Sequence, residues 1–354
     1  MNNNIINTIC LVTPHNVYNY GALLQAYALS TYLKTLGVKV LLYDFPINKW
    51  KRNSFRERIY SLLIKISKYI WKKRLLEGKK EFDTFIKEFP LTQENNFSIY
   101  LVGSDQVWNP GNLNDYFSLK FAPDAAFKFS YAASIGIKNI SPEYEKKFVV
   151  AMQRLQLLSA REVDAAGEVE RLTNRKCLVH LDPSFLLSVN EWQSNEVEYN
   201  INEPYILIYL LHIPKDINKI LNIIKKKYKK TIYIIDQRGF LHYCIRGALP
   251  IIDAGPRQFL WLIHHADLII TSSFHGTAFS IIYNKPFLPL INLKSPSRIK
   301  NLLEICGIDS NIDNPIDFIQ QLNYSTINSN LNKKIHESEE YLKYALQEAK
   351  KWQM

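Results

Sequence analysis

The sequence has few cysteines, no long hydrophobic run and no glycine-rich dinucleotide motif of the GxGxxG type. Its four cysteines, Cys10, Cys177, Cys244 and Cys306, lie far apart, without a CxxC pair or a His/Cys cluster. Scattered cysteines of this kind indicate a reducing compartment and argue against a zinc or iron–sulfur site. No apolar stretch approaches the roughly 18 residues that cross a bilayer. The first residues also lack the basic and apolar regions of a signal peptide. We therefore expect a cytoplasmic protein or one attached to the inner face of the cell membrane.

The positive charge of the chain is concentrated in one segment. The net charge is +11, and residues 49–80 hold twelve Lys or Arg against two Glu, a balance of 12 − 2 = +10. No helix-turn-helix, RNP or zinc-finger pattern accompanies this charge, so we do not expect a nucleic-acid partner. Apolar residues recur at helical spacing over 55–76, with Trp50, Tyr60 and Trp71 nearby. One interpretation is an interfacial helix that lies on anionic lipid; the alternative is a helix that packs on its own domain.

The alternation of apolar strands and helical segments predicts an α/β protein. At 354 residues, the expected number of domains is two, each of about 150–180 residues. We predict a first domain over 1–187 with a basic helical insertion at 49–80, and a linker at 188–203. A second α/β domain over 204–330 follows, and a long polar helix over 331–354 that braces back on the first domain.

The most informative stretch is residues 268–287. An apolar strand over 268–271 leads into Ser272, Ser273, His275, Gly276 and Thr277, and then into a predicted helix. Ligands bind beyond the carboxyl ends of parallel strands, and helix N-termini offer free N–H groups to anions. His275 could therefore donate a proton to a phosphorylated substrate. The alternative is that Ser272 or Ser273 caps the helix and His275 packs against the sheet.

Two other predicted strand ends carry polar side chains. Ser104, Asp105, Gln106 and Asn109 follow an apolar strand over 99–102, and Arg161 follows another over 155–159. Arginine binds carboxylate or phosphate through two parallel hydrogen bonds. The alternative for Arg161 is an ordinary surface helix start. A polar loop before the helix at 299–306 adds two more cations, Lys294 and Arg298.

With these residues collected, the chain resembles the polysaccharide pyruvyl transferase family, especially its bacterial capsule-cluster members. Six segments in order carry the resemblance. They are residues 19–29 (NYGALLQAYAL), 102–110 (VGSDQVWNP), 131–136 (YAASIG), 160–162 (ARE), 181–184 (LDPS) and 272–277 (SSFHGT).

The resemblance implies two Rossmann-like domains that face a cleft in a GT-B-like architecture. It also implies transfer of the enolpyruvyl unit of phosphoenolpyruvate to two sugar hydroxyls, which gives a pyruvate ketal and phosphate. His275 matches the histidine proposed as the acid, Arg161 an arginine that binds the donor, and Asp105 an acidic residue near the acceptor. Much of the family has arginine where this chain has Ser273, so Lys294 and Arg298 are our candidates to replace it.

We divide the candidate residues between a donor side and an acceptor side of the site. The donor side takes Arg161, Ser272, Ser273, Gly276, Thr277, Lys294 and Arg298, and the acceptor side Asn19, Tyr20, Gln25, Ser104, Gln106, Trp108 and Asn109. The chemistry requires neither a metal nor an organic cofactor, so we expect none. The acceptor in such assembly is often carried on polyprenyl diphosphate at the membrane, which would suit a peripheral protein. Two alternatives stay open: a GT-B-type glycosyltransferase that uses a nucleotide sugar, and a non-catalytic scaffold of polysaccharide biosynthesis.

Overall fold

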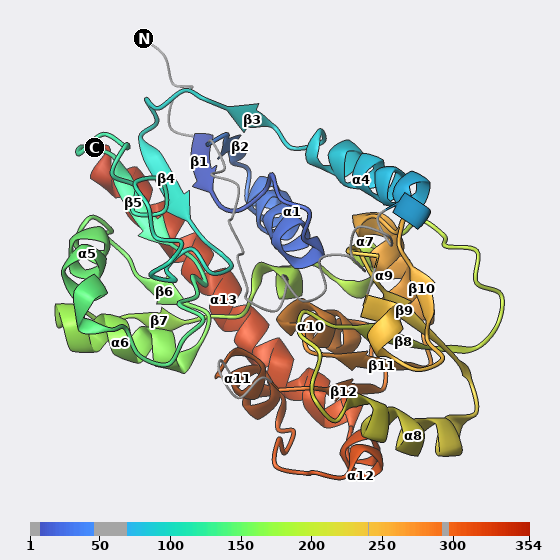
Figure 1. Cartoon of the computed structure of the whole chain (residues 1–354). Helices are drawn as coiled ribbons and strands as arrows, with labels where there is room; N and C mark the ends of the chain where they lie inside the picture. The colour runs from blue at the N-terminus through green and yellow to red at the C-terminus, as the bar shows by residue number, and fades with distance from the viewer. Residues whose placement is uncertain (1–7, 46–68, 240, 292–296) are drawn as a thin grey trace.

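Two parallel five-stranded sheets form the two halves of the chain (Figure 1). The computed structural model describes residues 8–45, 69–239, 241–291 and 297–354. The first sheet has the order β3-β2-β1-β4-β5 and consists of β1 (Thr8–Val12), β2 (Lys39–Tyr43), β3 (Leu91–Thr92), β4 (Ile99–Val102) and β5 (Phe127–Ser130). The second has the order β10-β9-β8-β11-β12 and consists of β8 (Tyr205–Tyr209), β9 (Thr231–Ile235), β10 (Leu249–Ile251), β11 (Leu268–Thr271) and β12 (Phe287–Pro289).

Both sheets therefore have the same strand order, 3-2-1-4-5 when each is counted along the chain. The direction of winding reverses between β1 and β4 in the first sheet and between β8 and β11 in the second. In open α/β sheets a crevice forms outside the carboxyl ends of the strands at such a reversal. A short parallel pair, β6 (Ser159–Ala160) and β7 (Leu178–Val179), continues the first sheet beyond β5 through bridges such as Ala133 to Ala160.

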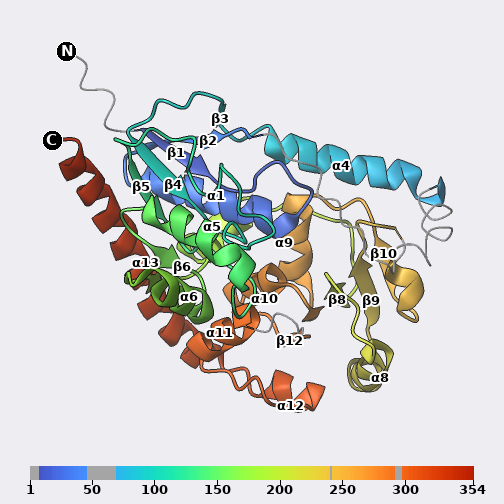
Figure 2. The same cartoon turned by 60° about the vertical axis from the view of Figure 1, so that its left-hand side comes forward.

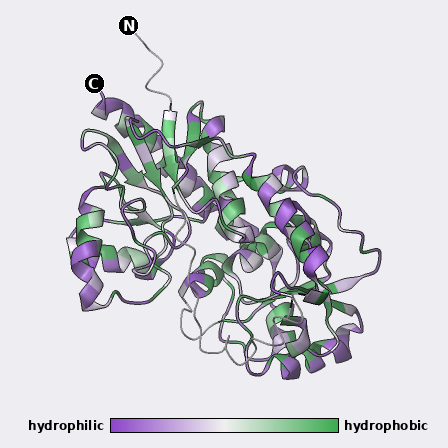
Figure 3. Ribbon diagram, turned by 45° about the horizontal axis from the view of Figure 1, so that its top comes forward, coloured by the Kyte–Doolittle hydropathy of each residue, from purple (hydrophilic) through white to green (hydrophobic). Residues whose placement is uncertain are grey.

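Helices cover the sheets and connect their strands. Within the described residues they are α1 (Tyr20–Thr35), α4 (Lys72–Ile86), α5 (Pro142–Gln153), α6 (Val163–Thr173), η1 (Pro183–Leu186), α7 (Val189–Gln193), α8 (Ile217–Tyr228), η2 (Leu241–Cys244), α9 (Pro256–His265), α10 (Phe274–Ile282), α11 (Ser297–Cys306), α12 (Pro315–Gln320) and α13 (Tyr324–Trp352). Strands β1, β4, β8 and β11 have almost no exposed residue, as expected of parallel strands covered on both faces. Figure 3 shows apolar residues along the strands and hydrophilic residues on the peripheral helices.

The two halves are joined through packed side chains. The ring of Tyr20 on α1 stacks on Phe259 of α9 at 4.4 Å, and its hydroxyl donates to the carbonyl of Ala254 at 2.7 Å. Helix α4 runs from the first sheet onto the second half (Figure 2), where Arg74 makes a bidentate pair with Asp253 at 2.7 and 2.9 Å. The first sheet and the second thus hold each other through α1, α4 and α9.

The long C-terminal helix braces back on the first domain, as predicted. Helix α13 begins at Tyr324, earlier than the predicted 331, and crosses from the second half to the first sheet (Figure 1). There Tyr341 donates to the carbonyl of Ser130 at 2.8 Å, and Trp352 donates to the carbonyl of Ala125 at 2.9 Å.

The structure contains a helix within the segment that we predict to be a linker. The polar segment 188–203 contains α7, whose Ser188 and Glu191 form a capping box and whose Trp192 is fully buried. This segment is therefore not a simple spacer, because a large side chain anchors it in the core. Most of the predicted basic helix over 55–76 lies outside the described residues. In the part of the chain that is described, no helix combines the length and the apolar character needed to cross a membrane.

Candidate active site

A cavity of about 510 Å³ lies where the reversal points of the two sheets face each other. The loops after β1, β4, β8 and β11 all contribute to its wall, as the shared strand order requires. It is lined by Pro14, Val17, Tyr18, Asn19, Ala22, Asp105, Gln106, Asn112, Phe117, Leu211, Ser273, Phe274, His275 and Arg298. Six of the predicted site residues are therefore brought to one cavity: His275, Asp105, Ser273, Arg298, Asn19 and Gln106.

His275 stands in the first turn of α10, close against helix α1. Ser273 caps α10, since its side chain accepts a hydrogen bond from the Gly276 amide at 3.3 Å. A Cβ atom placed on Gly21 would lie 2.0 Å from His275 Nδ1, so only glycine leaves room for the imidazole there. His275 is 6% exposed, and its ring reaches the cavity. One half of our alternative therefore holds, because Ser273 caps the helix, but His275 lines the cavity and is not confined to packing against the sheet.

Asp182 is the residue on which the distant motifs converge. Its Oδ2 accepts from Arg161 NH1 at 2.6 Å and from Ser104 Oγ at 3.3 Å, and lies 3.4 Å from His275 Nε2. Its Oδ1 accepts from the amide and hydroxyl of Ser184 at 3.0 and 2.8 Å. Burial alone would raise the pKa of Asp182, but His275, Arg161 and the Ser184 amide hold it far below its usual range. The carboxylate is therefore charged throughout the neutral range.

Asp182 was not among our predicted site residues, although the LDPS segment that contains it carries the resemblance. The available signal is its position: Asp182 lies three residues after the end of β7 and precedes a proline. What the sequence could not show was that this end would meet the ends of β4 and β11.

Arg161 lies beneath the cavity wall, not in the wall itself. Its guanidinium stacks 4.3 Å from the ring of Phe274 and lies 3.7 Å from Asp105 Oδ1 and 3.8 Å from Glu162 Oε2. Burial alone would lower the pKa of Arg161, but Asp182, Asp105 and Glu162 outweigh this effect and raise it. Its Nε and NH2 atoms are buried without a hydrogen-bond partner among the described residues. Arg161 is therefore a permanent buried cation with donors left over.

Asp105 reaches the cavity because of the tight turn that follows β4. Gly103 adopts φ +124°, and a Cβ atom there would lie 2.2 Å from the carbonyl oxygen of Tyr131, so the turn requires glycine. The Asp105 side chain is 19% exposed and lines the cavity. A carboxylate in this position can accept a proton from a bound hydroxyl.

Arg298, at the start of α11, is a second cation in the cavity. Burial, and next the like charge of Arg161, lowers the pKa of its guanidinium. Its Nε is buried and has no hydrogen-bond partner among the described residues. Arg298 shares the cavity with Ser273, where much of the family has arginine. The other candidate, Lys294, lies outside the described residues.

Several residues assigned to the acceptor side are buried and need correction. Trp108 is fully buried and packs on Phe148. Gln25 Nε2 donates to Thr13 Oγ1, and its Oε1 accepts from the Ser104 amide at 3.2 Å. Tyr20 joins the two halves, as described above. Asn109 is half-buried and joins its loop to the segment after β5 by donating to the carbonyl of Ile135 at 2.8 Å. These side chains, like Ser104, build the floor of the site and do not line the cavity.

Three residues assigned to the donor side are also engaged elsewhere. Ser272 Oγ accepts from the Leu211 amide at 3.0 Å, and Thr277 Oγ1 donates to the carbonyl of Ser273 at 3.1 Å. The Gly276 amide is taken by the Ser273 cap. The cap uses an amide that we expect to meet an anion, so these residues position His275 instead of lining the donor site.

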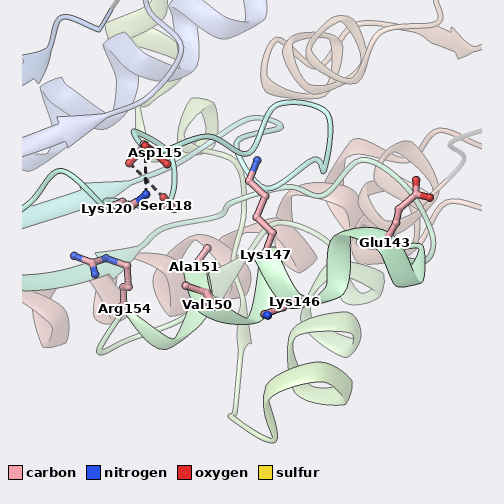
Figure 4. A pocket seen from close by; sticks show the side chains of 9 residues that line it. All are labelled: Asp115, Ser118, Lys120, Glu143, Lys146, Lys147, Val150, Ala151 and Arg154. Atoms are coloured by element: carbon pink, nitrogen blue, oxygen red, sulfur yellow. Dashed lines mark hydrogen bonds and ion pairs between the residues drawn. The ribbon is translucent and has the colours of Figure 1, made fainter.

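A second hollow, of about 580 Å³, lies on the first domain beside α5 (Figure 4). It is lined by Lys120, Lys146, Lys147 and Arg154 together with Asp115 and Glu143. Arg154 is tied to Asp124 at 3.0 Å, and Lys147 donates to the carbonyl of Leu113. None of the residues in the six motif segments lines it, so it is not the candidate active site.

One group within the described residues could offer three ligand atoms to a metal ion. Glu196, His264 and His265 bring such atoms within 4.8 Å of one another. His264 Nδ1 already pairs with Glu196 at 3.1 Å, and none of the three lines the cavity. The expectation that the reaction uses no metal or cofactor stays a prediction.

Comparisons with known proteins agree with this architecture. A family model described as polysaccharide pyruvyl transferase matches residues 19–294. Among solved structures, a UDP-GlcNAc 2-epimerase from Neisseria meningitidis, bound to UDP-GlcNAc, is 11% identical with a TM-score of 0.51, over 97% of this chain and 100% of that one. A glycosyltransferase from Rickettsia africae is 12% identical with a TM-score of 0.51, over 97% and 98%.

A third neighbour is UGT89C1 from Arabidopsis thaliana, which is 10% identical with a TM-score of 0.51, over 96% of this chain and 99% of that one. Identities this low show the fold alone, which is GT-B-like. No curated protein matches the chain by sequence.

Proposed function

The chain belongs to the polysaccharide pyruvyl transferase family, and on this premise we propose that it converts phosphoenolpyruvate and a sugar into a pyruvate ketal and phosphate. The observation that carries the proposal is one cavity that holds an imidazole, a carboxylate and a guanidinium: His275, Asp105 and Arg298. Arg161 lies directly beneath. These are the groups that an enol phosphate with two anionic ends requires.

The donor is held by cations in this proposal. Phosphoenolpyruvate carries a carboxylate and a phosphate, and buried guanidinium groups bind such groups strongly because little water competes. We assign one anionic end to Arg298 and the other to the spare donors of Arg161. The carboxylates around Arg161 fix its orientation, with NH2 beside Asp105, which lines the cavity, and Nε beside Glu162.

The reaction then needs one proton donor and one acceptor. His275 gives a proton to C3 of the enol, while a sugar hydroxyl attacks C2 and loses its proton to Asp105. A second hydroxyl of the same sugar then attacks C2, and the bond from C2 to the phosphate oxygen breaks. The proton held by Asp105 and the proton of the second hydroxyl go to His275 and to the departing phosphate, one each, so charges and atoms balance. Before Asp105 takes up its proton, its carboxylate and that of Asp182 stabilise the positive charge that develops at C2 as C3 is protonated.

Phosphate release from phosphoenolpyruvate in the presence of a panel of sugars tests the proposal. We expect release by the wild type, with a product whose mass equals the sugar plus one pyruvate ketal. His275→Ala should abolish both, whereas His265→Ala, which alters an exposed histidine outside the cavity, should not. Equal release by His275→Ala and wild type would remove His275 from the mechanism, and no release with any sugar would contradict the reaction.

The structural neighbours favour one second candidate, a glycosyltransferase that uses a nucleotide sugar, because one of them is named as a glycosyltransferase and UGT89C1 has been solved in complex with UDP-L-rhamnose. A thermal-shift comparison separates the two. The proposed function predicts stabilisation by phosphoenolpyruvate and none by UDP-GlcNAc. A non-catalytic scaffold predicts no shift with either ligand and no turnover.

We extend the proposal to a lipid-linked acceptor at the inner membrane surface. One face of α4 supports this, since Lys72, Lys73, Lys79 and Lys80 are exposed there. Leu76 lies between them and is 54% exposed, and Tyr69, just before the helix, is 83% exposed. Lysines around exposed apolar side chains suit an anionic lipid surface. The opposite face is fixed to the protein through Arg74 and Phe82.

Co-sedimentation with vesicles that contain phosphatidylglycerol tests this part. We expect salt-sensitive binding that Lys72→Glu/Leu76→Ser reduces at least several-fold. A matched control is Lys146→Glu/Val150→Ser, which likewise replaces one lysine and one exposed apolar residue on α5, where Val150 is 55% exposed. Equal losses in both variants would show a general charge effect and contradict a role for α4.

A further inference from the structure

Asp182 contacts two of the groups to which the proposed function gives a role, Arg161 and His275. Asp182 is 1% exposed, and its Oδ1 accepts two hydrogen bonds from Ser184. Oδ2 is left to face Arg161, Ser104 and His275. One oxygen atom therefore contacts a permanent cation on one side and lies 3.4 Å from a titratable ring nitrogen on the other.

The imidazole of His275 has two nitrogens in different surroundings. Nε2 is directed at Asp182 and is buried without a formed hydrogen bond. Nδ1 lies against the backbone of Gly21, where the ring fills the place that a side chain would take, and His275 lines the cavity. A carboxylate beside one ring nitrogen fixes the proton on that nitrogen and leaves the other for chemistry. Distances of this kind are often long before the substrate binds and shorten in the complex.

We propose that Asp182 is a positioning residue that holds the proton on Nε2 of His275, so that Nδ1 is the atom that exchanges a proton with the substrate. The same carboxylate oxygen accepts a hydrogen bond from Arg161 and so orients its guanidinium. One carboxylate therefore serves both donor binding and proton transfer. This inference rests on the proposed function for its kinetic part only.

This assignment explains why residue 21 is a glycine. The imidazole occupies the place that a side chain at position 21 would take, and Ala22, the next residue, lines the cavity together with His275. Glycine at position 21 thus allows the ring to lie beside the cavity with Nε2 at Asp182. Proton transfer at Nδ1 also leaves the Asp182 contact intact throughout, since Nε2 keeps its proton in both states of the ring.

The ring can be observed directly in the wild-type protein. With ¹⁵N-labelled histidine, we expect the NMR signals of neutral His275, identified by their loss in His275→Gln, to show a protonated Nε2 and an unprotonated Nδ1. The opposite tautomer would overturn the proposal. This measurement needs neither turnover nor a folded variant of Asp182, so its outcome is separate from that of the proposed function.

Kinetics of Asp182→Asn give the second test. We expect kcat to fall on the order of 10²–10⁴-fold with a smaller change in KM for phosphoenolpyruvate. The alkaline limb of the pH–rate profile should move to lower pH, because the imidazolium loses its neighbouring anion. A merely structural role would not move this limb.

Glu162→Gln is the matched control. Glu162 is an equally buried carboxylate beside Arg161, but it binds Ser134 and the amides of Ile135 and Gly136, not His275. We expect lower thermal stability with the alkaline limb in place. Equal pH profiles for wild type and Asp182→Asn, or equal displacement in both variants, would overturn the positioning role even if the wild type transfers pyruvate.

Discussion

The backbone of Gly21 and the imidazole of His275 are in direct contact, so that a single added methyl group at Gly21 would overlap Nδ1. The two residues come from opposite halves of the chain, one in the first turn of α1 and the other in the first turn of α10. This contact joins the two halves of the chain at the site where the proposed chemistry occurs.

Gly21→Ala should therefore displace His275 and lower kcat on the order of 10²-fold, because small misplacements of a catalytic group have effects of that size. Phosphate release is the measurement. Gly167→Ala is the matched control, since a Cβ atom there meets nothing within 4 Å and alanine is the better helix former in α6. Full activity of Gly21→Ala would show that the imidazole has freedom that the structure does not suggest.

Arg298 should contribute more to substrate binding than to the stability of the fold. A buried cation costs stability unless it is paired, so Arg298→Met should leave the melting temperature unchanged or raise it. The KM for phosphoenolpyruvate should rise about 10–100-fold, as expected when a hydrogen-bonded charge is lost. Lys300→Met, two residues away and outside the cavity, should change neither. A lower melting temperature with an unchanged KM would assign Arg298 to structure alone.

The sequence predicts the architecture well because its evidence is local. Each strand that ends in polar residues marks one edge of a sheet, and parallel strands bring such ends together. The positions of His275 and Asp105 follow from that rule, whereas Arg298 is a candidate because it lies in the polar loop before the helix at 299–306. Even the helix within 188–203 had a readable signal, the Ser188-x-x-Glu191 capping box.

The fate of individual motif side chains depends on partners far along the chain, and local patterns do not contain that information. Gln25 and Ser104 resemble ligand contacts in sequence, but in the structure Gln25 Oε1 accepts from the Ser104 amide and the Ser104 hydroxyl donates to the carbonyl of Ala132. Trp108 is buried because Phe148, 40 residues later (148 − 108 = 40), packs against it. Asp182 shows the reverse: its role is evident only when Arg161 and His275 are placed around it.

Lowering the pH should reduce the free energy of unfolding because His180 becomes protonated. Burial lowers its pKa from 6.5 to about 4, while the ring stacks on Tyr341 at 4.4 Å. Between these values the unfolded chain binds the proton more readily than the folded one, so stability falls as the pH drops from about 6.5 towards 4. The effect is at most about 3 kcal/mol. Urea unfolding of wild type and His180→Gln at pH 7 and pH 5 measures it.

His180→Gln should show a smaller loss between these two pH values than wild type, although it is less stable at pH 7. His336→Gln, which removes an exposed histidine on α13, should leave the loss unchanged. The same loss in His180→Gln and in wild type would show that other groups carry the pH dependence, and buried His15, whose pKa burial also lowers, is the next to test.

The link between Arg74 and Asp253 should carry measurable energy between the two halves of the chain. The pair is bidentate, and Tyr199 donates to the same carboxylate at 2.6 Å. Burial alone would raise the pKa of Asp253, but Arg74 and Tyr199 lower it. A double-mutant cycle with Arg74→Met and Asp253→Asn should give a coupling free energy of about 1 kcal/mol or more.

Lys73 and Glu77 provide the control within the same helix, because they are 4.0 Å apart and their side chains are 91% and 51% exposed. Their cycle, with Lys73→Met and Glu77→Gln, should give a coupling near zero. If both cycles gave the same value, the contact of α4 with the second half would contribute no more than an ordinary surface pair. In that case the apolar packing of Tyr20 on Phe259 would be the main link between the two sheets.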